Sequence, residues 1–169
     1  MKKVLIVLAL GSAAGWWYFI GGRQVTQEDV QAFYRAQEHA LLKREPAALC
    51  ALLDAQYQAN TVVTTQGREA TSVLDKAEAC EASQAMFDLF QTVGEKMGGI
   101  VQLDSGLTVD SVTLTPNRQS AEARITQSLD VAGAFMRIRL TSTDTLVRRN
   151  GKVLLLRSEV RSQVSSAGR

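Results

Sequence analysis

The order of hydrophobic patterns along this chain of 169 residues constrains its fold more than any single motif. In most of the first hundred residues, apolar side chains recur three and four positions apart, which predicts helices. After residue 100 they alternate with polar ones, which predicts half-buried strands. Helices that precede strands are typical of an α+β fold, with helices on one face of a sheet. We therefore expect about three helices packed on a curved antiparallel sheet of about four strands.

The first two helices have recognisable starts. Thr26 stands three residues before Asp29, an acidic variant of the capping box, and predicts a helix that continues to about Lys43. Pro46 suits the first turn of a second, short helix, which is expected to end at Leu53.

A third, long helix is expected from about Thr71 to Met97, stopped by Gly98-Gly99. Gly94 lies on its apolar stripe and should weaken the last turns by about 1 kcal/mol relative to Ala. Between the second and third helices, residues 57–66 are β-branched in the middle. This run predicts a short edge strand or an extended loop.

The second half of the chain predicts strands joined by tight turns. Asn150-Gly151 is a strong signal for a two-residue hairpin turn between the last two strands. The expected strands are Ile100–Thr115, Ala121–Val131, Phe135–Arg149 and Lys152–Val164.

Residues 1–23 form a separate amino-terminal segment, in which Lys2 and Lys3 precede 17 uncharged residues, Val4–Ile20. As a transmembrane helix, this run is at the lower limit of the roughly 17–25 residues that span a bilayer. Trp16 and Trp17 would then lie at the outer interface, with both lysines inside.

A cleaved signal peptide is the alternative, with Ser12-Ala13-Ala14 as the cleavage site. Cleavage there would leave an exposed aromatic terminus that is costly to keep soluble, so the uncleaved signal-anchor is preferred. Gly11 and Gly15 match the small-xxx-small pattern of paired membrane helices, which leaves a homodimer open. The domains expected are 1–23 as anchor, 24–165 as one folded domain and 166–169 as a disordered tail.

Composition excludes some functions. A net charge of +2 and the lack of basic clusters interleaved with aromatics argue against nucleic-acid binding. The charge is uneven, because residues 24–98 carry 6 Lys+Arg against 11 Asp+Glu, whereas residues 101–169 carry 10 against 6. Such asymmetry can orient a partner. Arg137 and Arg139 alternate onto one strand face and are the candidate partner face.

The two cysteines, Cys50 and Cys80, predict a disulfide, because an exported chain folds in an oxidising compartment. A metal site would need further Cys or His nearby, and His39 is the only histidine. A redox pair would usually be spaced C-x-x-C. A disulfide would attach the long helix to the short second one.

The chain resembles the nuclear transport factor 2-like superfamily, also called the cystatin-like cone. The resemblance covers about residues 26–164 and rests on the element order and on the closing hairpin, residues 144–160, DTLVRRNGKVLLLRSEV. That hairpin is similar to the ending of SnoaL-like members. The family implies a cone with an apolar pocket between the long helix and the concave sheet. Some members catalyse isomerisation or cyclisation there, and others bind partners.

The candidate pocket residues are Tyr34, Tyr57, Phe87 and Phe90, the two tyrosines as hydroxyl donors. The alternative is that the two tyrosines are core residues, whose rings are buried and whose hydroxyls reach solvent. His39 lies off the helix stripe and is expected to face solvent.

Register decides the environment of the acidic residues on the last hairpin. With a two-residue turn, Asp144 falls opposite Arg157 and Ser142 opposite Glu159. Asp144, Arg157 and Glu159 would then form a charge network on one face, although a one-residue bulge would change that face.

The sequence contains no catalytic serine elbow, P-loop, H-E-x-x-H or zinc-ligand set, so neither a metal nor a cofactor is expected. The leading hypothesis is a non-enzymatic accessory subunit in the bacterial inner membrane, single-pass, with its domain in the periplasm and a protein partner there. The alternatives are a secreted periplasmic form, a small apolar ligand binder or isomerase/hydratase-like enzyme, and an envelope stress or immunity protein.

Overall fold

A computed structural model describes residues 24–96, 98–99, 101–131 and 136–166 of the chain. The proposed anchor, with Gly11, Gly15, Trp16 and Trp17, lies outside the described residues. Among the helices described, none combines the length and the hydropathy that crossing a membrane requires.

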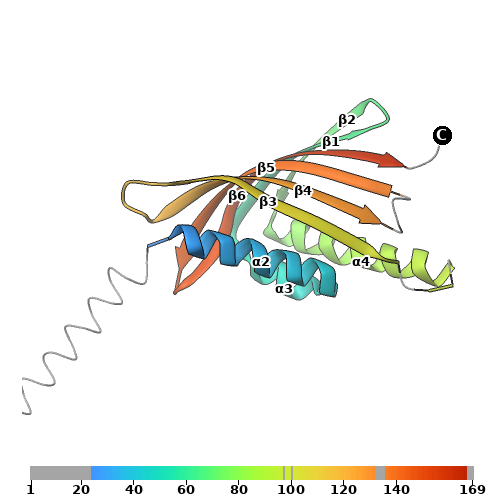
Figure 1. Cartoon of the computed structure of the whole chain (residues 1–169), viewed down its shortest axis with the longest axis horizontal. Coiled ribbons are helices and arrows are strands. Elements are labelled where there is room, and N and C mark those ends of the chain that lie inside the picture. The colour runs from blue at the N-terminus through green and yellow to red at the C-terminus, as the bar shows by residue number, and fades with distance from the viewer. Residues whose placement is uncertain (1–23, 97, 100, 132–135, 167–169) are drawn as a thin grey trace, which may run out of the picture.

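The three helices of the described residues lie on one side of a single curved sheet (Figure 1). The helices are α2 (Gln27–Lys43), α3 (Pro46–Ala51) and α4 (Lys76–Lys96). The strands are β1 (Leu53–Thr65), β2 (Arg68–Asp75), β3 (Leu103–Leu114), β4 (Ser120–Val131), β5 (Met136–Arg149) and β6 (Lys152–Ser166). Their order in the sheet is β2-β1-β6-β5-β4-β3. The α+β cone-like architecture is therefore confirmed.

The sheet has six strands in the described residues, where about four were expected, and β1 runs parallel to β6. The expected edge strand or loop at residues 57–66 is a longer strand inside the sheet, between β2 and β6. The long helix does not begin near Thr71, because residues 68–75 form β2 and pair antiparallel with β1. Gln66 and Gly67 both have positive φ, of 52° and 77°, as a two-residue hairpin turn requires.

Local signals explain where the helices start. The capping box of Thr26 and Asp29 is formed, as predicted. A second box opens α4, because the Glu78 N–H donates to Asp75 and the Asp75 N–H donates to Glu78, each at 2.9 Å. The short helix α3 ends at Ala51 rather than Leu53, which already belongs to β1.

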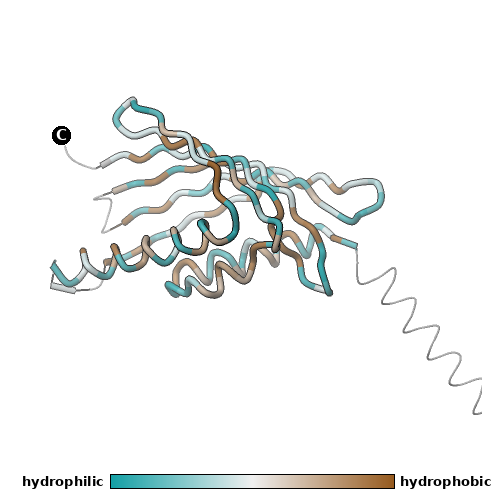
Figure 2. Tube along the Cα trace, turned by 180° about the vertical axis from the view of Figure 1, so that it is seen from behind, coloured by the Kyte–Doolittle hydropathy of each residue, from teal (hydrophilic) through white to brown (hydrophobic). Residues whose placement is uncertain are grey.

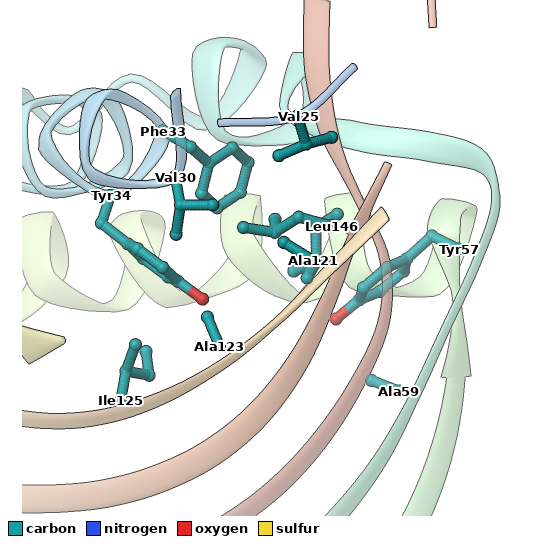
Figure 3. Packing of buried hydrophobic residues seen from close by; sticks show 11 residues of the cluster. Val25, Val30, Phe33, Tyr34, Tyr57, Ala59, Ala121, Ala123, Ile125 and Leu146 are labelled. Carbon is teal, nitrogen blue, oxygen red and sulfur yellow. The ribbon is translucent and has the colours of Figure 1, made fainter. Parts of the chain in front are cut away.

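Two apolar clusters fill the space between helices and sheet. Figure 2 shows hydrophobic and hydrophilic residues alternating along the strands, as one buried sheet face requires. The first cluster, drawn in Figure 3, lies under α2 and includes Val25, Val30, Phe33, Tyr34, Tyr57, Ala121, Ala123, Ile125 and Leu146. The second consists of Phe87, Phe90, Val101, Leu129 and Val131. The predicted disulfide Cys50–Cys80 is present and joins α3 to α4.

Gly94 has a different role from the one its helix propensity predicts. A Cβ at this position would stand 2.5 Å from the carbonyl oxygen of Gly99, whose N–H donates to the Gly94 carbonyl at 2.9 Å. The chain folds back closely over Gly94 after α4, so the glycine is required by packing.

Candidate functional site

A buried carboxylate lies at the centre of the helix-covered face of the sheet. Asp144 of β5 is 2% exposed, and its Oδ2 accepts a hydrogen bond of 2.8 Å from the hydroxyl of Tyr34 on α2. Its Oδ1 accepts a hydrogen bond of 2.5 Å from the hydroxyl of Ser158 on β6. Tyr34 and Ser158 are 1% and 3% exposed. One helix and two strands thus supply a polar cluster, Tyr34–Asp144–Ser158, inside an apolar core.

A β-bulge on β6 places Ser158, rather than Arg157, opposite Asp144. Leu146 pairs with Leu155, but Thr145 pairs with Arg157, so Leu156 is the extra residue. Asp144 consequently pairs with Ser158, and the predicted pairing of Asp144 with Arg157 is wrong.

The expected charge network on the last hairpin is also absent from these strands. Ser142 pairs with Val160 rather than Glu159, which pairs with Thr143. Arg157 and Glu159 are exposed, whereas Asp144 is buried on the face of the sheet that the helices cover. The bulge alters the alternation of β6, and that separates the carboxylate from both charges.

Burial controls the acid–base behaviour of this cluster. Loss of solvation raises the pKa of Asp144, although hydrogen bonds from the Ser158, Tyr34 and Ser142 hydroxyls lower it in part. Burial and the neighbouring Asp144 carboxylate also raise the pKa of Tyr34. The same two causes raise the pKa of Tyr57 to about 12. Both tyrosines therefore remain neutral hydrogen-bond donors at physiological pH.

Tyr57 approaches the same region from the other side. In Figure 3 the hydroxyls of Tyr34 and Tyr57 both point toward the strands, with Leu146 and Ala121 between the two rings. The predicted pair Phe87 and Phe90 lies elsewhere, in the second apolar cluster. The four candidate pocket residues are therefore divided between two clusters, and only the tyrosines lie near Asp144.

Polar side chains also mark the boundary between the two clusters. On β4, Gln127 stands between Ile125 of the first cluster and Leu129 of the second, and its amide donates to the Ser105 hydroxyl at 3.4 Å. On α2, the Oε1 of Gln37 is buried and has no hydrogen-bond partner within the described part of the chain. An unsatisfied buried acceptor is uncommon in folded proteins.

In the part of the chain that the structure describes, the other face of the sheet carries no helix (Figure 1). Residues that pair across neighbouring strands form a row that runs across the sheet. Because successive residues of a strand point to opposite faces, the rows next to the one that contains Asp144 face away from the helices. Three neighbouring rows form what we call the helix-free face: Arg124, Thr143, Glu159 and Asn60; Thr126, Thr141, Arg161 and Val62; Ser128, Arg139, Gln163 and Thr64.

Two adjoining grooves cross the helix-free face. The larger has a volume of about 600 Å³ and is lined by Arg124, Glu159 and Arg161 among others. The smaller, of about 430 Å³, includes Arg139 and shares Thr141 and Arg161 with the first. In the residues that the structure describes, no ion pair involves any of these three arginines. The grooves therefore offer three unpaired cations against one carboxylate.

The two arginines of the expected partner face differ in their surroundings. Arg137 forms a two-pronged contact with Asp130, with Nε at 2.5 Å from Oδ1 and Nη2 at 3.2 Å from Oδ2. Hydrogen bonding to Arg137 lowers the pKa of Asp130. Arg139 is exposed and lines the smaller groove. Arg139 is thus the more available cation of the pair.

Sequence reasoning missed Arg124, Arg161 and Ser158. Arg124 and Arg161 lie 37 residues apart on β4 and β6, so only strand order brings them to one groove. His39 is exposed, as predicted. Among the described residues, no group of His, Cys, Asp or Glu is arranged to hold a metal ion.

Comparisons with known proteins agree on the fold. A putative scytalone dehydratase from Novosphingobium aromaticivorans superposes with a TM-score of 0.57 at 13% identity, covering 84% of this chain and 87% of that one. A ketosteroid isomerase-like protein from Erwinia carotovora superposes with a TM-score of 0.51 at 15% identity, covering 82% of this chain and 98% of that one. A nuclear transport factor 2-like protein of unknown function from Silicibacter pomeroyi superposes with a TM-score of 0.52 at 13% identity, covering 80% of this chain and 93% of that one.

No family model matches the chain, and no curated protein does. At these identities the structural likeness shows the nuclear transport factor 2-like cone fold and no activity.

Proposed function

We propose that this protein is a non-enzymatic accessory subunit, anchored in a bacterial inner membrane by residues 4–20, whose periplasmic domain binds a protein partner through its helix-free face. The observation that carries the proposal is the pair of adjoining grooves with the unpaired cations Arg124, Arg139 and Arg161. Unpaired charges in an exposed groove favour a partner of opposite charge and accelerate its association.

The contrast with the interior supports this choice. Both carboxylate oxygens of Asp144 already accept hydrogen bonds, and the cluster is almost closed to solvent. The grooves are accessible without any rearrangement. The Cys50–Cys80 disulfide supports a location in an oxidising compartment, where such bonds persist.

The test uses the full-length chain purified from native membranes in mild detergent, with the intact mass measured on the product. Arg139→Glu with Arg161→Glu reverses two exposed charges in the grooves. Arg35→Glu with Arg68→Glu makes the same charge change at exposed positions outside them. We expect the first variant to lose a stoichiometric partner that the wild type and the control retain. Equal recovery of the partner with all three proteins would overturn the role of the helix-free face.

A second candidate function is binding of a small apolar ligand, or isomerase- or hydratase-like catalysis, in the interior. The raised pKa of Asp144, the Tyr34 and Tyr57 donors and the unsatisfied Gln37 acceptor favour it. A carboxyl and a phenol in apolar surroundings can move a proton and stabilise developing negative charge. Two proteins of this fold are described as dehydratase or isomerase-like.

The second candidate is tested with small cyclic enones as probes, added to the purified full-length protein. Enone binding that Tyr34→Phe weakens, with Gln84→Ala on the exposed side of α4 as control, would support the interior site. No saturable binding of any enone to the wild-type protein would remove this candidate.

A further inference from the structure

The first described residues are fastened to one end of the sheet. Val25 is fully buried, and its N–H donates to the carbonyl of Arg118 at 2.7 Å. The Nη1 of Arg148 donates to the carbonyl of Gln24 at 3.0 Å and to Asp29 at 2.8 Å. Backbone and side-chain bonds thus hold the beginning of the domain in place, so the chain enters it at a fixed point.

Two turns lie beside this entry point. Figure 1 shows the chain entering at the end of the sheet where the β3–β4 turn and the β5–β6 turn project, while the carboxyl terminus lies at the opposite end. We call residues 115–120 and 147–152 the hairpin end. It is the part of the described domain beside the point where the chain enters.

The hairpin end is basic and hollowed. Arg118, Arg149 and Lys152 are exposed. A pocket of about 520 Å³ lies there, and its lining combines Arg149 with the polar residues Thr115, Asn117, Gln119 and Ser120 and the apolar residues Pro116 and Val147. Cationic, hydroxyl and amide groups are the usual partners of phosphate oxygens.

The neighbouring acids leave these cations largely available. Asp29 is engaged by Arg148. Asp54 is buried and lies 3.4 Å from Arg149, whose side chain is still 54% exposed. Glu28, on the first turn of α2, and Glu122, two residues after Ser120 on β4, are further exposed carboxylates.

Chain length limits how far the hairpin end can lie from the bilayer. Only Gly21, Gly22 and Arg23 separate Ile20 from Gln24. The four Cα–Cα steps from Ile20 to Gln24 reach at most about 14 Å when extended. The headgroup layer on each side of a bilayer is roughly 6 Å thick. An anchor that ends at Ile20 therefore keeps Gln24, to which Arg148 is hydrogen-bonded, within about 14 Å of the hydrocarbon, and the headgroup layer takes up roughly 6 Å of that distance.

We propose that the hairpin end is a lipid-contact site, at which Arg118, Arg149 and Lys152 and the pocket beside them bind the phosphate groups of anionic phospholipids. This inference rests on the proposed anchor. Basic residues held next to an anionic surface gain electrostatic attraction that falls off within a Debye length. The site would fix the orientation of the domain and turn the helix-free face toward the periplasm, where a partner can reach it.

The test places a spin label at each end of the domain. The two cysteines of the chain form a disulfide, so a third, introduced cysteine can be labelled selectively. Pro116→Cys is an exposed position in the β3–β4 turn, and Thr65→Cys is an exposed position at the β1–β2 turn. Full-length protein is reconstituted in vesicles of phosphatidylcholine with or without phosphatidylglycerol. Relaxation by oxygen and by a water-soluble nickel complex then reports the depth of each label.

We expect the label at residue 116 to reach headgroup depth in vesicles with phosphatidylglycerol and to move toward water in phosphatidylcholine or at high salt. The label at residue 65 should remain in water throughout. Arg118→Glu with Lys152→Glu should abolish the effect at residue 116. Arg35→Glu with Arg68→Glu, the same charge change away from the hairpin end, should preserve it.

The outcomes separate this inference from the proposed function. Protein that fails to float with the vesicles would overturn the anchor and the lipid site together. Protein that floats, but whose label at residue 116 stays in water in every vesicle, would overturn the lipid site alone. A melting temperature raised by inorganic phosphate in detergent, without any headgroup contact in vesicles, would assign the pocket to free phosphate and also overturn the lipid site.

Discussion

The hydroxyl of Tyr34 and the carboxylate of Asp144 form a hydrogen bond of 2.8 Å across 110 residues of sequence, in the interior of the domain. The bond joins α2 to the middle of β5, and Ser158 completes the coordination of the carboxylate from β6. Such a cluster is costly to bury unless all of its members are satisfied. It therefore ties the position of α2 on the sheet to the register of the last hairpin.

Replacing Tyr34 with Phe should destabilise the domain by about 1–3 kcal/mol, because a buried acceptor loses its donor. Urea unfolding followed by circular dichroism would measure the change in the free energy of unfolding. The matched control is Tyr34→Phe in an Asp144→Asn background, where the effect should shrink. Equal effects in both backgrounds would mean that the Tyr34–Asp144 bond is not the source of the stabilisation.

The raised pKa of Asp144 predicts that stability falls as pH rises. Between the unfolded value of 3.8 and the higher folded value, the native state binds more protons than the unfolded state. The free energy of unfolding therefore decreases with pH in that window and is independent of this group below it and above it. From acid to neutral pH, the free energy of unfolding of the wild type should decrease relative to that of Asp144→Asn, which lacks the titrating carboxyl. A difference that grows in the opposite direction would show that hydrogen bonding outweighs burial.

Removing the disulfide with Cys50→Ser and Cys80→Ser should cost about 3–4 kcal/mol in the chain-entropy model, because the bond closes a loop of 30 residues. The measurement is chemical unfolding with and without reductant. Reductant should destabilise the wild type by a similar amount and leave the double variant unchanged. If reductant left the free energy of unfolding of the wild-type protein unchanged, the result would contradict the disulfide.

Gly94→Ala should destabilise the domain by about 1–3 kcal/mol, the cost of overpacking. Helix propensity alone would predict a gain of about 1 kcal/mol for the same change. The two expectations have opposite signs because the added Cβ meets the Gly99 carbonyl. Gly99→Ala is the control, since a Cβ there has nothing within 4 Å. Thermal melting of the three proteins decides between packing and propensity.

Local signals in the sequence were sufficient for many elements. The Thr26–Asp29 capping box and the Asn150-Gly151 turn predicted the start of α2 and the last hairpin, and both are present. The hairpin of β1 and β2 was not predicted, although Gln66-Gly67 between two runs with β-branched residues is typical of a hairpin turn. The helix expected from about Thr71 overlaps residues 71–75, whose structure is determined instead by cross-strand pairing with β1.

The sequence by itself determined the elements that depend on near neighbours: helix caps, tight turns, the alternation of the last strands and the pairing of its two cysteines. Only the tertiary structure decided which side chains share a face. One extra residue, Leu156, reverses the environment expected for Asp144, and the strand order alone brings Arg124 and Arg161 into one groove. The physical reason is that bulges and strand order depend on how whole strands pack against each other, which nearest-neighbour patterns do not encode.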